Sequence, residues 1–109
     1  MKKFTNREFN ALSSEVFKIA KTITNKTINN CLISINKDYI NLSVQGSETE
    51  GYKGKCNVFF YKDRFAKVSE FRDFYKVLSV IPSVSYGKYL SIIFQEYMNC
   101  GKSETYFEF

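Results

Sequence analysis

A single proline, Pro82, interrupts residues 69–101, where apolar side chains otherwise recur at the spacing of amphipathic helices. Because the residue before a proline is biased away from helical backbone, a first helix is expected to end there and a second to follow. Ser69 suits the cap of the first helix, and Ser83 or Ser85 that of the second. The apolar stripes consist of Phe71, Phe74, Tyr75, Leu78 and Ile81 before the proline and of Tyr86, Tyr89, Leu90, Ile93, Phe94 and Tyr97 after it.

The second half of this stretch has two interpretations. Leu90, Ile92 and Phe94 alternate with their neighbours, as in a strand. The helical stripe is longer, however, and Gly101 stands where a glycine commonly ends a helix. We therefore predict a helix over residues 85–99, with a strand as the alternative.

The N-terminal segment has the signals of another helix. Thr5 and Glu8 have the spacing of a capping box, and Phe4 and Phe9 that of a hydrophobic staple. Threonine and asparagine then lower the helix propensity, so the helix is expected to end near Thr24. Its apolar stripe contains Phe9, Leu12, Val16, Ile19, Ala20 and Ile23.

Three runs, residues 31–36, 40–45 and 55–61, alternate apolar and polar side chains, the period of half-buried strands. A turn at residues 36–38 is expected to join the first two. Residues 46–54 contain three glycines and no apolar pattern, which is typical of a loop or hairpin tip. The runs predict an antiparallel sheet.

Two shorter segments complete the predicted fold. Residues 64–68 suit either a short fourth strand or the beginning of the next helix, and residues 105–109 a final strand that pairs with the sheet. A length of 109 residues is enough for one domain with its own core. The prediction is a small α+β domain, residues 1–109, with an N-terminal helix, an antiparallel sheet of three to five strands and a helix–turn–helix pair.

Positive charge is concentrated near the N-terminus. The formal net charge is +5, and residues 1–30 carry six bases against two acids. This distribution favours a polyanion or an acidic protein as partner. Ordinary solubility is the alternative explanation for a net charge of this size.

The first helix has a polar face opposite its apolar stripe. At about 100° per residue, this face collects three bases, small or amide side chains and no acid. Arg and Asn side chains can read guanine and adenine edges, and Lys and Ser suit phosphates, although an ordinary solvated face can look the same. The candidate nucleic-acid-binding residues are Arg7, Asn10, Ser14, Lys18, Lys21 and Asn25, with Lys53 and Lys55 of the hairpin on the DNA backbone.

The residue types of common catalytic and metal sites are scarce. The chain has no histidine, which excludes His-based acid–base catalysis and ordinary His–Cys zinc sites. The odd number and wide spacing of Cys31, Cys56 and Cys100 favour buried thiols over disulfides or a zinc site. Glu48 and Glu50 lie in the glycine-rich loop, where carboxylates are solvated. We expect no catalytic residue, metal or cofactor, and no enzyme.

The sequence also bears on location. The chain contains no apolar run of about 18 residues and no N-terminal apolar segment typical of a signal peptide. Neither a membrane nor the secretory route is indicated. A cytoplasmic protein with reduced thiols is expected.

A helix–turn–helix beside a hairpin with a glycine-rich tip resembles the winged helix-turn-helix class of DNA-binding proteins. The local match is Val84 followed by Ser85 at the turn. In that class the second helix of the pair enters the major groove and the wing touches the backbone or minor groove. Here the hairpin precedes the pair, and the outward face of residues 85–99 carries one base, an acid and an exposed Ile92. The first helix is electrostatically the better groove reader.

Two functions fit these observations. The first is a non-enzymatic DNA-binding protein, a plasmid or phage (mobile-element) accessory or regulatory factor that binds double-stranded DNA through the first helix and the hairpin wing. A homodimer joined through Ile92 would suit paired half-sites. The second is a protein-binding inhibitor module from a mobile element, which blocks a host nucleoprotein enzyme through its aromatic side chains and Ile92.

Overall fold

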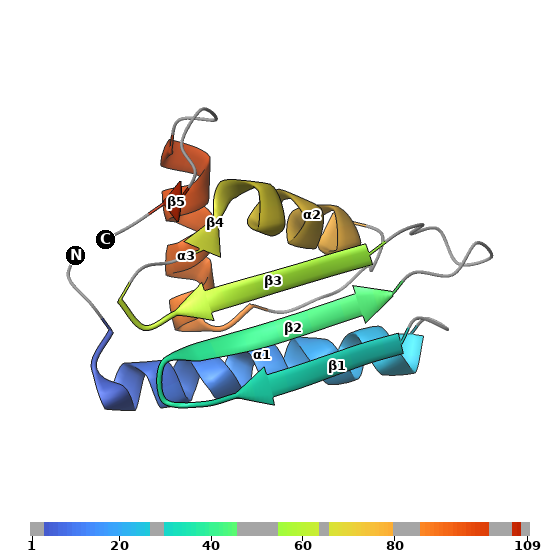
Figure 1. The fold of residues 1–109 in the computed structure, drawn as a ribbon, viewed down its shortest axis with the longest axis horizontal. Coiled ribbons are helices and arrows are strands. Elements are labelled where there is room, and N and C mark those ends of the chain that lie inside the picture. Colours follow the sequence, from blue (N-terminus) through green and yellow to red (C-terminus); the bar gives the residue numbers. More distant parts are fainter. Residues whose placement is uncertain are drawn as a thin grey trace.

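The computed structural model describes residues 4–26, 30–45, 55–63, 66–79, 86–100 and 106–107 (Figure 1). The elements in chain order are α1 (Asn6–Lys26), β1 (Asn30–Ile35), β2 (Tyr39–Gln45), β3 (Lys55–Tyr61), β4 (Ala66–Lys67), α2 (Val68–Ser79), α3 (Lys88–Asn99) and β5 (Tyr106–Phe107). The fold is α+β, as the sequence predicts.

β1, β2 and β3 form an antiparallel sheet in that spatial order. The register pairs Ile33 with Leu42 and Leu42 with Val58, so apolar side chains share one face across the strands. Successive side chains of a strand point to opposite faces. Alternate residues of β2 and β3 are therefore buried, and their neighbours lie on the other face.

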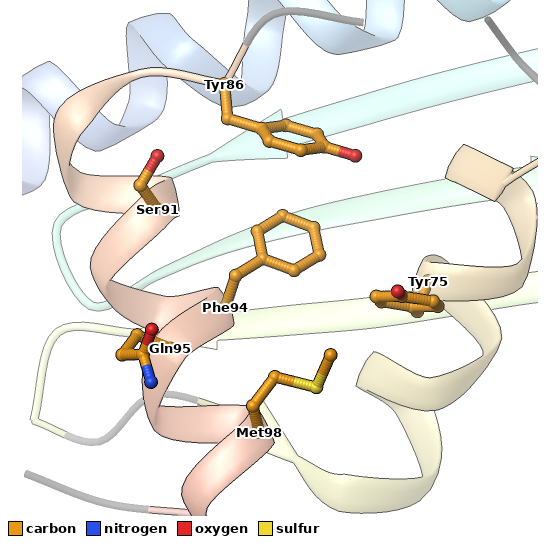
Figure 2. Close-up of a pocket in the computed structure, with 6 residues that line it drawn as sticks. All are labelled: Tyr75, Tyr86, Ser91, Phe94, Gln95 and Met98. Carbon is orange, nitrogen blue, oxygen red and sulfur yellow. The ribbon is translucent and has the colours of Figure 1, made fainter.

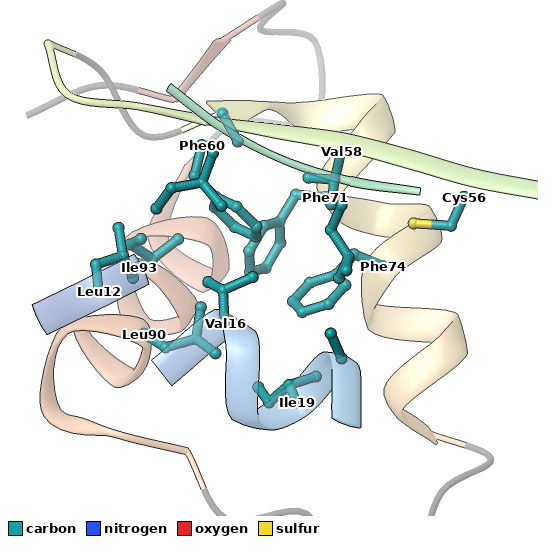
Figure 3. Close-up of a cluster of buried hydrophobic side chains, with 14 of the residues drawn as sticks. Leu12, Val16, Ile19, Cys56, Val58, Phe60, Phe71, Phe74, Leu90 and Ile93 are labelled. Atoms are coloured by element: carbon teal, nitrogen blue, oxygen red, sulfur yellow. The ribbon is translucent and has the colours of Figure 1, made fainter. Parts of the chain in front are cut away.

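α1, α2 and α3 pack on the apolar face of this sheet and close one core with it (Figures 1 and 3). Figure 3 shows side chains of α1, α2, α3 and β3 converging on the same interior. The ring centroid of Phe60 lies 6.1 Å from that of Phe71 and 5.5 Å from that of Phe74, both edge to face. Edge-to-face rings match the positive edge of one to the negative face of the other.

The predicted start of α1 is confirmed. The Thr5 N–H donates to the Glu8 carboxylate at 2.9 Å, and the Glu8 N–H donates to the Thr5 hydroxyl oxygen at 3.1 Å. Phe4 and Phe9, the predicted staple, are both buried. The helix continues to Lys26 rather than ending near Thr24.

The predicted helix pair is also present. Of the segment 64–68, the structure describes residues 66–68, which contain both alternatives in succession: β4 is followed directly by α2 at Val68. α3 is helical, so the strand alternative for residues 85–99 is wrong. Ser69, the expected cap of α2, instead lies inside this helix, which already begins at Val68. The other expected cap residues, Ser83, Ser85 and Gly101, lie outside the described residues, as does the glycine-rich loop of residues 46–54.

Two expectations are corrected. β5 does not join the three-stranded sheet but pairs with β4, Lys67 opposite Tyr106. The outer edge of β3 is instead engaged by α2, because the Phe59 N–H donates to the Glu70 carboxylate at 3.1 Å. Ile92 is not exposed: it is half-buried and packs against the core. The predicted dimer interface required an outward-facing Ile92 side chain, and the structure does not provide one.

Candidate nucleic-acid interface

The polar side of α1 forms one exposed surface. Its five described side chains, which we call the basic face, all reach solvent because they lie three or four residues apart, opposite the buried stripe. The basic face consists of Arg7, Asn10, Ser14, Lys18 and Lys21. Asn25 belongs to the same helix, but its side chain lies outside the described part.

Both acids of α1 are engaged by backbone N–H groups. Glu8 completes the capping box with Thr5. Glu15 reaches the N-terminus of α3, where its carboxylate accepts hydrogen bonds from the N–H groups of Tyr89 at 3.2 Å and Leu90 at 2.8 Å. These bonds satisfy N–H groups that have no partner within α3, and they place the negative charge at the positive end of its dipole. The carboxylates therefore do not turn toward the basic face.

Sequence reasoning missed the role of Glu15 as the cap of α3. The N-cap residue of α3 is Gly87, which has no side chain to cap the helix. A Cβ added at Gly87 would lie 2.1 Å from the Glu15 Cδ atom, so a larger residue here would displace the Glu15 carboxylate from the end of α3. A helix that begins without a Ser, Thr, Asp or Asn cap is a signal for a partner elsewhere, but it does not say which acid supplies it.

One hollow, of about 370 Å³, runs beside the basic face between α1 and β1. Lys18 and Lys21 line it together with Phe17 and Ile35, which are 44% and 50% exposed. The Lys21 Nζ atom lies 5.3 Å from the centre of the Phe17 ring, within the range of a cation–π contact. The hollow thus combines positive charge with an exposed aromatic ring.

A second hollow, of about 490 Å³, adjoins the N-terminal end of the basic face. It is polar: Asn6 and Asn10 of α1 meet Lys37, Asp38 and Lys62 there. The Asp38 carbonyl oxygen accepts a hydrogen bond from the Lys62 N–H at 3.1 Å, which brings the β1–β2 turn beside the end of β3. The Lys62 ammonium group donates to the Asn6 side-chain oxygen.

The turn that carries Lys37 is held by a side chain. The Asn36 side-chain oxygen accepts hydrogen bonds from the N–H groups of Asp38 at 2.8 Å and Tyr39 at 3.0 Å. Such an Asx turn replaces the hydrogen bonds that a tight turn leaves unmade. Lys37 and Lys62 were not among the predicted site residues, because only the strand register places them next to α1.

The other predicted residues are placed as follows. Lys55 is exposed at the start of β3, on the sheet face opposite α1, so the structure does not bring it to the basic face. Lys53 lies outside the described residues. The Ser14 hydroxyl donates to the Asn10 carbonyl at 3.3 Å, which leaves its oxygen available as an acceptor.

Another surface lies between α2 and α3. Figure 2 shows Tyr75, Tyr86, Phe94 and Met98 around a hollow of about 270 Å³, whose rim is completed by two polar residues of α3. The ring centroids of Tyr86 and Phe94 are 4.6 Å apart. Met98 is 63% exposed, and both tyrosines are about two-fifths exposed, at 41% and 42%. This aromatic surface is distinct from the basic face on α1.

The thiols of the sheet are packing groups. Cys56 is buried, as predicted, whereas Cys31 is half-buried. Burial raises the pKa of Cys56 to about 12 and that of Cys31 to about 11. Because the thiolate is the reactive form, both side chains are poor nucleophiles and poor metal ligands at neutral pH.

Comparison with protein-family models, curated proteins and solved structures gave no match. None of the helices in the described part of the chain is both long and apolar enough to cross a membrane.

Proposed function

We propose that this protein is a non-enzymatic DNA-binding protein that contacts duplex DNA through the basic face of α1. The observation that carries the proposal is the disposition of charge on this helix. Arg7, Lys18 and Lys21 are exposed on one side, while Glu8 and Glu15 are hydrogen-bonded to backbone N–H groups away from it. Cations presented in this way on a rigid helix suit a row of phosphates.

The basic face also offers side chains for base edges. Asn10 and Arg7 lie on adjacent turns and are both exposed. Asparagine can pair with the adenine edge and arginine with the guanine edge in the major groove. Lys18 and Lys21, one turn apart further along, supply phosphate contacts in this arrangement.

Lys37 and Lys62 extend the interface past the N-terminal end of α1. They approach Asn10 from the β1–β2 turn and from the end of β3. A DNA backbone that runs along α1 would meet both ammonium groups beyond Arg7. The negative charge of Asp38 in the same hollow repels a phosphate, so we assign Lys37 and Lys62 only a supporting role.

The test is binding to mixed-sequence duplex DNA across a salt series. Phosphate contacts of Lys18 and Lys21 predict a slope of about −2 in log Kobs against log salt, which contacts of Lys37 and Lys62 would steepen toward about −4. Lys18→Glu with Lys21→Glu should abolish binding, whereas Lys76→Glu with Lys88→Glu, which changes the net charge equally on α2 and α3, should leave most of it. No duplex affinity of the wild type at low salt, or equal loss in both variants, would contradict the proposal.

The aromatic surface between α2 and α3 favours a second candidate, a protein-binding module. Exposed aromatic and methionine side chains are enriched where protein partners dock, and Tyr86 and Met98 are the most exposed members. In a pull-down from host lysate, Tyr86→Ser with Met98→Ser should lose a partner that Lys18→Glu with Lys21→Glu retains. A partner retained by the aromatic variant, or none bound by the wild type, counts against this candidate.

A further inference from the structure

β1 is an outer strand of the sheet, and its outer edge meets no other strand among the described residues. The Asn36 N–H donates to the Tyr39 carbonyl oxygen at 3.0 Å, which marks this pair as hydrogen-bonded. Hydrogen-bonded pairs alternate along an antiparallel ladder. The even-numbered residues of β1 therefore bond to β2, and the N–H and C=O groups of Cys31, Ile33 and Ile35 point to the outer edge.

The edge strand on the other side of the sheet, β3, is covered by α2. The same alternation directs the Phe59 N–H of β3 outward, and Glu70 of α2 accepts its hydrogen bond at 3.1 Å. α2 packs along β3 and supplies the adjoining core residues Phe71 and Phe74. The fold thus closes the edge of β3 with a helix and a carboxylate, whereas β1 has no such cover in the described part of the chain.

β1 also lacks the features that keep an edge strand from pairing. Its six residues, Asn30–Ile35, include no charged side chain and no proline. Leu32 is 73% exposed on one face and Ile35 is 50% exposed on the other. Phe17 of α1 lines the same hollow as Ile35, so apolar surface lies beside the edge next to Lys18 and Lys21.

We propose that β1 pairs antiparallel with β1 of a second copy of this chain, around a two-fold axis at Ile33. This register sets Ile33 opposite its own copy and Cys31 opposite Ile35, each pair exchanging two hydrogen bonds. All of these residues lie on the core face of the sheet. The two three-stranded sheets become one continuous sheet, with α1 of both copies on the same side.

A second copy fits this edge better than an unrelated strand because β1 is complementary to itself. A two-fold axis requires that a patch match its own copy. On the core face the register opposes apolar side chains only, and on the outer face it opposes Leu32 to Ser34, a pair without charge. Every outward backbone group of Cys31, Ile33 and Ile35 finds a partner.

The pairing does not depend on DNA binding, and its response to salt has the opposite sign. In the dimer both basic faces lie on one side of the joined sheet, so Lys18 and Lys21 of each copy repel those of the other. Salt screens such repulsion. Raising the salt concentration should therefore strengthen self-association, while it weakens binding to DNA.

A charge-swap experiment tests the register. Leu32 and Ser34 are both exposed on the outer face, so charges there are compatible with the monomer fold. Leu32→Lys with Ser34→Lys sets lysines opposite lysines in the dimer, and Leu32→Glu with Ser34→Glu sets glutamates opposite glutamates. Each variant alone should weaken the dimer about tenfold or more, and an equimolar mixture should restore it as a heterodimer.

Sedimentation velocity over concentrations up to about 1 mM measures the association. Ser79→Lys with Asn99→Lys, on exposed positions of α2 and α3, adds the same charge as the lysine variant and should dimerise as the wild type does. Circular dichroism verifies that each variant is folded. A monomeric wild type over the whole range, or charged β1 variants that dimerise as the wild type does, would overturn the proposal.

Discussion

The Glu15 side chain stabilises a different helix from the one that carries it. It lies on α1 but caps α3 through the N–H groups of Tyr89 and Leu90. Gly87 allows this approach because a Cβ there would lie 2.1 Å from the Glu15 Cδ atom. The pair therefore fixes α3 against α1 and directs the carboxylate away from the basic face.

A double-mutant cycle tests this pair. Glu15→Ala should lower the free energy of unfolding by about 1–2 kcal/mol, the usual effect of losing a helix cap. Gly87→Ala alone should also destabilise, because the new methyl group must displace the carboxylate. In the Glu15→Ala background the same change should be neutral or stabilising, since alanine restricts the unfolded chain more than glycine does. Additive effects in urea denaturation would show that the two residues do not interact.

Cys56 makes the free energy of unfolding depend on pH in the alkaline range. Burial raises its pKa to about 12, above the ordinary value of 9.0. Below pH 9 the Cys56 thiol is protonated in both the folded and the unfolded protein, so its ionisation does not affect stability. Between about pH 9 and pH 12 the thiol ionises in the unfolded protein but stays protonated in the folded one. Stability should therefore fall by about 1.4 kcal/mol per pH unit from about pH 9 toward pH 12.

The measurement for this prediction is urea denaturation between pH 8 and pH 11. Cys56→Ala should be less stable at pH 8 but should lose stability less steeply as the pH rises. The half-buried thiol of Cys31, with its pKa raised to about 11, contributes in the same direction, so Cys31→Ala is the companion variant. Identical slopes in all three proteins would count against the assignment.

At the scale of elements, local signals placed most helices and strands correctly. The capping box begins α1 where predicted, and apolar periodicity distinguishes α2 and α3 from the strands. The prediction that the terminal strand β5 joins the three-stranded sheet was wrong, because its short sequence does not indicate which strand of the fold has a free edge. That depends on Glu70, which engages the outer edge of β3 from α2.

Glu70→Ala tests how α2 closes this edge. The change leaves the half-buried N–H of Phe59 without its acceptor and should lower stability by about 1–3 kcal/mol. Hydrogen exchange measured residue by residue should show faster exchange at Phe59 than in the wild type. Glu96→Ala, on another helix, is the control and should change neither quantity much. Unchanged protection of Phe59 would mean that the carboxylate is not its partner.

The whole molecule depends on one core that joins all its layers. Phe71 lies at its aromatic centre, where its ring centroid is 5.0 Å from that of Phe94 and 4.8 Å from that of Tyr97. It also contacts Phe60 of β3. A side chain that touches the sheet and α3 from α2 couples the stability of all three.

Phe71→Ala should therefore lower the free energy of unfolding by about 3–5 kcal/mol, a large part of what a domain of this size has. Tyr75→Ala, one turn along α2 and 41% exposed, should cost much less. Thermal unfolding followed by circular dichroism compares the two variants with the wild type. Equal losses in both would contradict the central position of Phe71.

The sequence by itself determined what depends on neighbours along the chain. The spacing of Phe9, Leu12 and Val16 predicts the buried side of α1, and the same spacing leaves Arg7 and Lys18 on its exposed side. Strand alternation likewise assigns the two faces of β2 and β3. These properties follow from the fixed geometry of helices and strands, so they can be calculated from position alone.

Only the tertiary structure decided which distant groups meet. It brought Lys37 and Lys62 beside Asn10, directed Glu15 to α3, buried Ile92 in part and left the edge of β1 without a partner strand in the described part of the chain. Each of these depends on strand register and on how the helices pack over the sheet. Register and packing are set by the whole core at once, because an apolar pattern says which side of an element is buried but not what it is buried against.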